Sequence, residues 1–356
     1  MANEEYSAMS LDIAPAPALS VVVPCYNETD NLRELHRRLT RVCRDLLDGD
    51  YEIVLVNDGS SDKTWPIMLE LAQRDTKLVL VNLSRNYGHQ LALSAGLQMC
   101  RGRRAFIIDA DMQDPPELLP DMMKRMDRGF DVVFGRRITR DGETKFKRAS
   151  AAAFYRLLGR LTDIDIPFDA GDFRLMSRRS IDILNAMPES SRFIRGMVSW
   201  IGLPQEAFAY ERAARFAGQT KYPFTKMVRF ALDAITGFSI RPLRLASYLG
   251  LAAGGASLLL LVYVIGSYLR GDVVQGWTSL TVIILIVSAA QLLMIGLLGE
   301  YLGRLYMESK RRPLFVIQDV IRGSGFDVAR LPTDPASHVS PAVDPDRKSS
   351  MLETGS

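Results

Sequence analysis

The sequence predicts an α/β fold built on a mostly parallel sheet, followed by two long apolar helices. Short apolar segments alternate with segments of helical periodicity from residue 19 to residue 135. The apolar segments are nearly continuous, as in parallel strands that helices cover on both faces. Two uncharged runs follow, at 245–269 and 273–299, and we place the second helix at 277–299. At ~1.5 Å rise per residue, such helices cross the ~30 Å hydrocarbon core of a membrane.

The elements of the α/β part follow from these two periodicities. We expect strands at 19–24, 51–57, 77–82, 104–109 and 131–135. We expect helices at 31–47, 64–74, 89–100 and 116–128. The next stretch is basic and less regular, with a helix at 143–161 and then a loop, a short strand and a helix within 168–184. Ligands of such sheets bind at the carboxyl ends of the strands, so the loops there are the candidate site.

Composition excludes several classes of protein. The net charge is +3, from 44 basic and 41 acidic residues, which is too balanced for a nucleic-acid partner. Cys25, Cys43 and Cys100 have no metal-ligand spacing, and we expect them to be reduced thiols. The polar, Ala/Pro-rich stretch 1–18 has no pattern of a signal peptide and is expected to be a disordered lead-in.

The charges around the two apolar runs predict the membrane orientation. Basic residues precede the first run and follow the second, whereas the connecting loop has only Arg270, balanced by Asp272. The positive-inside rule then places both termini and the large N-terminal domain in the cytoplasm, at the inner membrane. A pair of buried core helices is the alternative, but uncharged runs of this length are rare in soluble domains.

The remaining segments complete the expected organisation. We assign 19–222 to the α/β domain, 223–243 to an amphipathic segment, and 244–303 to the two membrane helices. The amphipathic segment is expected to lie on the membrane surface, and a core helix of the soluble domain is the alternative. The cytosolic tail 304–356 contains one candidate strand at 313–321 and is expected to be disordered after about residue 322.

Acidic and polar motifs follow three of the expected strands. They are "PCYNE" from Pro24, "NDGSSD" from Asn57 and "DADMQD" from Asp109. A D-x-D pair at a strand end can hold Mg²⁺ or Mn²⁺, which share their coordination sites with phosphates. A G-x-G-x-x-G fingerprint and a P-loop are both absent from the sequence, which disfavours dinucleotide-dependent oxidoreductases and NTPases.

Taken in order, these motifs resemble those of the polyprenyl-phosphate glycosyltransferases of the GT-A fold, family 2. The resemblance is carried by "VVVPCYNE", "VNDGSSDKT", "LSRNYGHQLALSAGL", "DADMQDPPE", "GDFRL" and "ERAARFAGQTKY", followed by two apolar runs. It covers residues 19 to 320. It implies a GT-A catalytic domain in the cytosol, a C-terminal two-helix transmembrane hairpin, and inverting transfer of a sugar to a lipid phosphate.

The resemblance also implies roles for particular residues. The nucleotide pocket would be lined by Pro24, Tyr26, Glu28, Asp58 and Asp109. The metal would be held by Asp109, Asp111 and Gln113, with Asp111 as the direct catalytic ligand. Asp172 of "GDFR" would be the catalytic acid or base, or would orient other groups. The acceptor phosphate would be bound by Arg136, Arg137, Arg148, Arg215 and Lys221, although Arg148 equally suits a solvated helix face.

This chemistry is physically consistent. A metal would neutralise charge on the departing nucleotide diphosphate. The acceptor phosphate monoester, with a second pKa of ~6, is already ionised at neutral pH, so a strong general base is less necessary. The motifs favour UDP-glucose as the nucleotide-sugar donor, and GDP-mannose, UDP-galactose, UDP-N-acetylhexosamine or an aminoarabinose donor stay open. The acceptor would be undecaprenyl phosphate.

Two rival functions remain at this point. A processive polysaccharide synthase is disfavoured because the stretch 192–202 lacks the Q-x-x-R-W motif of those enzymes. A non-catalytic membrane scaffold or flippase partner is disfavoured because the acidic and basic motifs are intact. Small residues in the first apolar run, Gly250, Gly254 and Gly255, also predict helix packing and self-association into a homo-oligomer.

Overall fold

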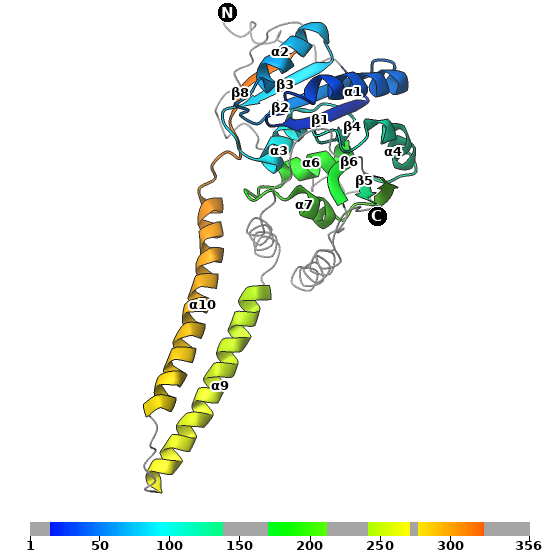
Figure 1. Ribbon diagram of the computed structural model, residues 1–356. Coiled ribbons are helices and arrows are strands. Elements are labelled where there is room, and N and C mark those ends of the chain that lie inside the picture. Colours follow the sequence, from blue (N-terminus) through cyan, green and yellow to red (C-terminus); the bar gives the residue numbers. More distant parts are fainter. Residues whose placement is uncertain (1–14, 138–169, 212–240, 271–276, 324–356) are drawn as a thin grey trace, which may run out of the picture.

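The computed structural model describes residues 15–137, 170–211, 241–270 and 277–323. These residues form an α/β unit from which two long helices extend next to each other (Figure 1). The lead-in up to residue 14, the expected helix at 143–161, most of the amphipathic segment and the tail after residue 323 lie outside the described residues. The domain limits drawn there stay predictions.

The described part of the α/β unit contains one eight-stranded mixed sheet. Its strands are β1 (Leu19–Cys25), β2 (Tyr51–Asn57), β3 (Leu78–Leu83), β4 (Arg104–Ile107), β5 (Val132–Arg137), β6 (Ala170–Ser177), β7 (Gln205–Tyr210) and β8 (Ile317–Arg322). The order across the sheet is β7-β5-β6-β4-β1-β2-β3-β8. β4, β1, β2 and β3 pair in parallel, as do β5 and β7. β6 and β8 pair with their neighbours in the antiparallel sense.

Helices cover both faces of this sheet, which explains the nearly continuous apolar strands. One core layer packs α1 (Leu32–Leu47), α2 (Thr64–Arg74) and α4 (Leu119–Met126) onto the sheet. The other packs α3 (His89–Met99), α6 (Arg178–Ala186) and α7 (Ile194–Ile201) onto the opposite face. Val21 and Val23 of β1 belong to the first layer and Val22 to the second, as the two-residue period of a strand requires.

The predicted strands and helices up to residue 135 are confirmed, but their neighbours were not all foreseen. β5 does not lie beside β4, because β6 is inserted between them and runs antiparallel to both. The short strand expected within 168–184 therefore occupies the interior of the sheet. α7 and β7 were not anticipated within the mixed basic region. The candidate strand at 313–321 is confirmed as β8, which pairs with β3 at the edge of the sheet.

A pair of aromatic rings fastens β6 to its neighbour β4. The rings of Phe106 and Phe173 meet edge to face with centroids 5.3 Å apart, and both side chains are fully buried. The ring centroid of Tyr210 on β7 lies 5.2 Å from that of Phe173. In the sheet, β7 and β4 lie on opposite sides of β6. Gly135 leaves room for this cluster, because a Cβ there would lie 2.5 Å from the Phe173 ring. The inserted strand is thus held by packing on both sides.

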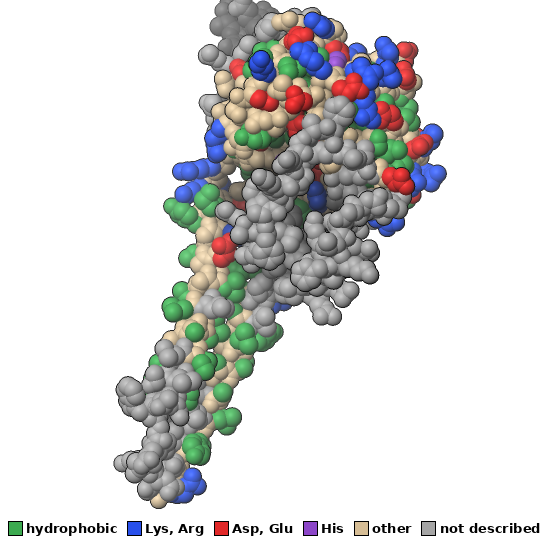
Figure 2. All heavy atoms as spheres, in the orientation of Figure 1, with side chains coloured by type: hydrophobic (Ala, Val, Ile, Leu, Met, Phe, Trp, Pro, Cys, Tyr) green, Lys and Arg blue, Asp and Glu red, His purple; other side chains and the backbone are tan. Residues whose placement is uncertain are grey.

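The two C-terminal apolar runs form the long helices α9 (Arg241–Leu269) and α10 (Trp277–Ser309). Their apolar side chains face outward, with Leu251 77% and Leu292 69% exposed. Charged side chains instead gather on the α/β unit in the view of Figure 2. Within the described residues, one segment, Ile286–Ser309, is long and apolar enough to cross a membrane by its length and composition. The helices are therefore observed, and two membrane crossings with cytoplasmic termini stay a prediction.

The contact between α3 and the sheet yields a test of the fold. A Cβ at Gly96 would lie 2.4 Å from Val22 Cγ1 and 3.0 Å from Val56 Cγ2. We expect Gly96→Ala to lower the free energy of unfolding by about 1–3 kcal/mol, because the helix must move away from β1 and β2. Gln98→Ala, on the exposed side of the same helix, is the matched control. Denaturant unfolding of the purified protein measures both, and equal stability of the two variants would contradict this packing.

Candidate active site

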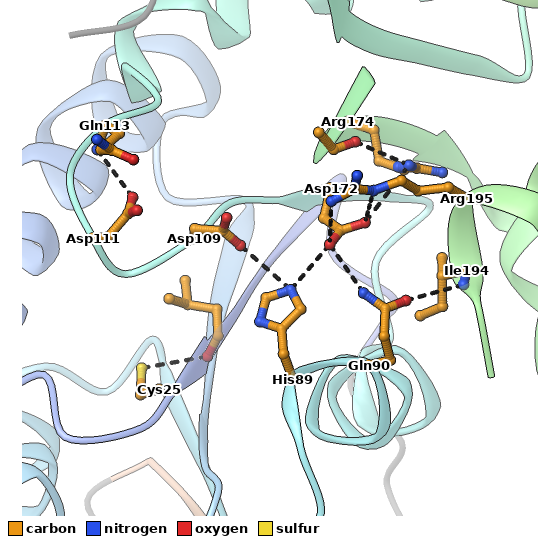
Figure 3. Close-up of polar contacts among 12 residues, drawn as sticks. Cys25, His89, Gln90, Asp109, Asp111, Gln113, Asp172, Arg174, Ile194 and Arg195 are labelled. Carbon is orange, nitrogen blue, oxygen red and sulfur yellow. Dashed lines mark hydrogen bonds and ion pairs between the residues drawn. The ribbon is translucent and has the colours of Figure 1, made fainter. Parts of the chain in front are cut away.

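The sheet topology brings the polar motifs to one edge. The carboxyl ends of β1, β2 and β4 lie together because these strands are parallel neighbours. β6 begins at the same edge, since Ile107 at the end of β4 pairs with Arg174 near the start of β6. Asp109 follows β4 by two residues, so it comes next to Asp172 of β6. Figure 3 shows these two carboxylates on either side of His89.

The first loop of the site carries the residues expected to hold the nucleotide. Pro24 is buried within β1, whereas Tyr26 is 48% exposed. Glu28 accepts a hydrogen bond from Asn31 Nδ2, and its own backbone N–H donates to Thr64 Oγ1. The loop is thus tied to the helix that follows it and to α2. The structure brings these residues to the site edge, and their contacts with a nucleotide stay predicted.

Asp58, directly after β2, organises the neighbouring loop. Its carboxylate oxygens accept hydrogen bonds from the backbone N–H groups of Tyr87 (2.7 Å) and Gly88 (3.0 Å). Burial raises the pKa of Asp58, while these two donors act in the opposite direction. The side chain is 2% exposed. It therefore holds the segment that leads into α3, in addition to the expected hydrogen bond to a base.

The D-x-D segment follows β4 as an irregular turn. Asp109 points toward His89, whereas Asp111 points toward Gln113, whose backbone N–H donates to Asp111 Oδ1 at 3.1 Å (Figure 3). Met112 between them has φ of 62° and is buried, which fixes this turn. Asp114 is buried in the bend before the short 3₁₀ helix Pro116–Leu118, and the hydroxyl of Tyr210 donates a hydrogen bond to it.

Asp109 is the carboxylate of the D-x-D segment whose negative charge is disfavoured by its surroundings. Burial raises its pKa to about 6, and the negative charges of the surrounding aspartates act in the same direction, against the charge of His89. Its Oδ1 is buried and accepts no hydrogen bond from the described residues, and His89 Nε2 lies 3.5 Å away. A cation bound beside Asp109 would relieve both the repulsion and the missing interaction.

A divalent metal needs oxygen ligands that can reach one point. No group of three or more His, Cys, Asp or Glu side chains converges on one point within the described residues. However, Asp109, Asp111 and Gln113 each have a side-chain oxygen that can bind a metal, and all three lie within one turn of the chain. In addition, Asp109 Oδ1 is buried and accepts no hydrogen bond from the described residues. Mg²⁺ and Mn²⁺ need only one or two protein carboxylates and complete their shells with water and phosphate. The residues therefore fit such an ion.

Asp172 of β6 is the centre of the densest polar network in the site. Arg195 Nε donates to its Oδ1 at 2.9 Å and Arg195 Nη2 to its Oδ2 at 3.2 Å. Gln90 Nε2 donates to Oδ2 at 3.0 Å, and His89 Nε2 lies 3.1 Å from the same oxygen. Arg174 contributes a further charge at 3.8 Å. Asp172 is 3% exposed, so these donors replace water around it.

The network determines the charge of its members. Burial alone would raise the pKa of Asp172, but the charge of Arg195 and the hydrogen bonds from His89 and Arg195 hold it well below its usual value. Burial lowers the pKa of Arg174 to about 10. Burial also acts to lower the pKa of His89, and its carboxylate neighbours outweigh this and raise it. Asp172 is thus a permanent anion whose oxygens are occupied by donors.

Several members of this network were missed from the sequence. His89 and Gln90 begin α3 in "NYGHQ", and Arg195 lies on the unforeseen helix α7. Gln90 also accepts a hydrogen bond from the backbone N–H of Ile194, so it joins the two helices. The motif "NYGHQ" belongs to a stretch that carries the family resemblance, and its position after β3 is the signal that marks it. Nothing local to Arg195 distinguishes it from a solvated residue.

The predicted lipid-phosphate residues are only partly visible. Arg136 is exposed near the end of β5, at the same edge of the sheet as Asp172, since it pairs with Ala170. Arg137 ends β5, and its side chain lies outside the described residues. The predicted residues Arg148, Arg215 and Lys221 also lie outside them. Their role in binding an acceptor stays a prediction.

Comparisons with known proteins agree with this architecture. Residues 20–184 match the model of glycosyl transferase family 2. An uncharacterized glycosyltransferase, YkcC of Bacillus subtilis, is 45% identical over 88% of this chain and 97% of its own. The prophage bactoprenol glucosyl transferase homolog of Escherichia coli is 37% identical over 85% of this chain and 99% of its own. The bactoprenol glucosyl transferase of Shigella phage SfV is 38% identical over 85% and 98%.

Proteins of solved structure are less similar to this chain in sequence than these relatives are. A complex of S. aureus TarS with UDP-GlcNAc aligns over 61% of this chain and 65% of that chain, at 17% identity and a TM-score of 0.43. Identity with the full-length relatives far exceeds this level. The chain belongs to glycosyl transferase family 2, and the protein is a glycosyltransferase.

The network around Asp172 yields a stability prediction. Asp172→Asn removes the anion that Arg174 and Arg195 share, so it leaves buried positive charge uncompensated. We expect the free energy of unfolding to fall by about 3 kcal/mol. Asp182→Asn on α6 is the control, because that carboxylate is 64% exposed and its ion pair contributes little. Denaturant unfolding compares the two variants. If Asp172→Asn lost no more stability than Asp182→Asn, the stabilising role of the network around Asp172 would be refuted.

The raised pKa of Asp109 predicts how stability depends on pH. Its folded pKa of about 6 exceeds its usual value of 3.8, so the native state holds a proton more tightly than the unfolded chain. Stability should therefore fall as pH rises from about 4 to 6, and Asp109→Asn should remove this loss. In metal-free protein at pH 7, we expect Asp109→Asn to be more stable by about 3 kcal/mol, since each pKa unit corresponds to about 1.4 kcal/mol. Unfolding in EDTA at pH 4.5 and 7 measures the difference, which should shrink to about 1 kcal/mol at the lower pH.

Proposed function

We propose that this enzyme transfers a sugar from a nucleotide-diphosphate sugar to a polyprenyl phosphate at the cytoplasmic face of the membrane. UDP-glucose is the proposed donor and undecaprenyl phosphate the proposed acceptor. The observation that supports this most is the likeness to relatives named bactoprenol glucosyl transferase, which extends over 85% of the chain and nearly their full length. It therefore includes the C-terminal helices as well as the catalytic sheet.

The donor would bind at the edge formed by β1, β2 and β4. In this proposal Tyr26 and Asp58 contact the nucleoside, and Asp109 and Asp111 face the diphosphate, with Gln113 as a neutral partner. A divalent metal held by these residues would supply positive charge to the leaving diphosphate. Asp109 Oδ1 is buried and accepts no hydrogen bond from the described residues, so a cation bound there would stabilise its negative charge.

The acceptor would approach from the side of the site where the basic residues lie. Its phosphate is ionised at neutral pH, so it can attack the anomeric carbon without losing a proton to the enzyme. Asp172 is poorly suited to act as a base, since Arg195, His89 and Gln90 donate to its oxygens. We assign Asp172 the role of orienting Arg195 and His89. Arg136 at the end of β5 would attract the acceptor phosphate.

The two long helices give the enzyme its access to the acceptor. A polyprenyl chain stays within the bilayer, so the catalytic unit must be held against the membrane surface. α9 and α10 lie next to each other and extend away from the catalytic unit, and they expose apolar side chains along their length. Lys310, Arg311 and Arg312 follow α10 and are exposed, as expected for residues at the cytoplasmic surface. In this proposal both helices cross the membrane.

A panel of nucleotide sugars tests the donor and the acceptor together. Membranes containing the protein are incubated with undecaprenyl phosphate and labelled UDP-glucose, UDP-galactose, UDP-N-acetylhexosamine, an aminoarabinose donor or GDP-mannose. We expect a labelled lipid from UDP-glucose, stable to mild base and sensitive to mild acid. A labelled lipid from another donor alone would correct the proposed sugar. The absence of labelled lipid with every donor would refute the proposed reaction.

Asp111→Asn tests the role of the D-x-D segment. The substitution removes one negative charge from the proposed metal site, so we expect transfer to fall at least about 100-fold. The melting temperature should be unchanged, because Asp111 is partly exposed at a turn. Asp121→Asn, which neutralises an exposed carboxylate on α4, is the control and should retain full activity. Transfer by Asp111→Asn at the wild-type rate would show that the metal assignment is wrong.

A further inference from the structure

Three polar side chains lie opposite one another on three neighbouring strands, away from the network of Asp172. The register pairs Asn57 at the end of β2 with Asn82 of β3, and Asn82 with Asp319 of β8. Asn57 Nδ2 donates to Asn82 Oδ1 at 2.8 Å, and Asn82 Nδ2 donates to Asp319 Oδ2 at 3.0 Å. We call these three side chains the polar ladder.

The polar ladder continues into both loops of the proposed donor site. Asn57 Oδ1 accepts from the backbone N–H of Ser60, in the loop that carries Asp58. Ser60 Oγ accepts from the backbone N–H of Asn27, in the loop that carries Tyr26. Asn27 has φ of 58°, a left-handed conformation that its side chain supports by accepting from the backbone N–H of Ser61 at 2.9 Å.

The energetics of this arrangement make its members interdependent. Asn57 is 3% exposed and Asn82 is 8% exposed, so each needs its hydrogen bonds to offset the cost of burial. The amide nitrogen of Asn82 donates a hydrogen bond to Asp319, and its amide oxygen accepts one from Asn57. Without Asp319 the amide of Asn82 would turn to seek another acceptor, and the hydrogen bond to Asn57 would be lost with it.

We propose that Asp319 is a positioning residue for the nucleotide-sugar donor. Through the polar ladder it fixes the orientation of Asn57, and through Asn57 it fixes the loops that carry Asp58 and Tyr26. β8 follows α10 after residues 310–316, so the segment after the second long helix completes the donor site. This inference rests on the proposed function, because it assumes that these two loops bind the nucleotide.

Three full-length variants test the role of Asp319. Asp319→Leu removes the acceptor for Asn82, whereas Asp319→Asn keeps an oxygen that can accept from the same amide. Gln318→Ala changes an exposed neighbour on the same strand and is the matched control. Asp319→Ala removes the same acceptor without adding an apolar side chain, and it replaces Asp319→Leu if that variant does not fold.

Steady-state kinetics separate positioning from a structural role. In Asp319→Leu we expect KM for the nucleotide sugar to rise about tenfold, the effect of one lost buried hydrogen bond. We expect kcat and KM for the lipid acceptor to stay unchanged, and Asp319→Asn and Gln318→Ala to behave as the wild type. A merely structural role would instead lower the active fraction, and hence the apparent kcat, with KM for the donor unchanged.

Hydrogen exchange tests the polar ladder without any ligand. In Asp319→Leu we expect faster exchange of the amides of residues 57–63, because Ser60 N–H loses its fixed acceptor, and no change in Asp319→Asn. Unchanged exchange and an unchanged KM for the donor in folded Asp319→Leu would overturn the inference. If the wild type transfers no sugar, the proposed function fails, and the exchange of these amides still decides whether Asp319 orders the loop.

Discussion

The buried negative charge of Asp172 is the constraint on which the site depends. A carboxylate that is 3% exposed costs several kcal/mol unless charged and polar donors replace its water. Its donors come from different parts of the chain: His89 and Gln90 from α3, and Arg195 from α7. Because all must reach one carboxylate, α3, α7 and β6 are held in fixed relation. The same arrangement places Asp109 next to His89.

The site divides into regions of opposite character. Asp109, Asp111 and Asp114 concentrate negative charge where the chain leaves β4, and burial keeps the pKa of Asp109 near 6. Arg195 and Arg174 lie on the side of β6, with Asp172 between them and the D-x-D segment. The acidic region suits a bound divalent cation, and the basic region suits an anionic group. His89 joins the two regions by contacting both Asp109 and Asp172.

Much of this organisation was predictable from local patterns, and the remainder was not. Apolar runs bounded by turns identified β1 to β4, because strands buried on both faces are apolar at every position. β6 was harder to place, since Asp172 and Arg174 interrupt its apolar residues, and these charges are stable only beside α3 and α7. The polar ladder could not be foreseen either. Asn57, Asn82 and Asp319 are far apart in sequence and meet only through strand register.

Periodicity and the order of residues within short segments were enough to predict the α/β class, the long apolar helices and the acidic motif at the end of β4. The folded structure was needed to show that β6 runs antiparallel between β4 and β5, and that His89 and Arg195 share one carboxylate. It also showed that the strand after α10 pairs beside β3. Such choices depend on which buried charges and backbone groups find partners, and those partners lie on distant segments of the chain.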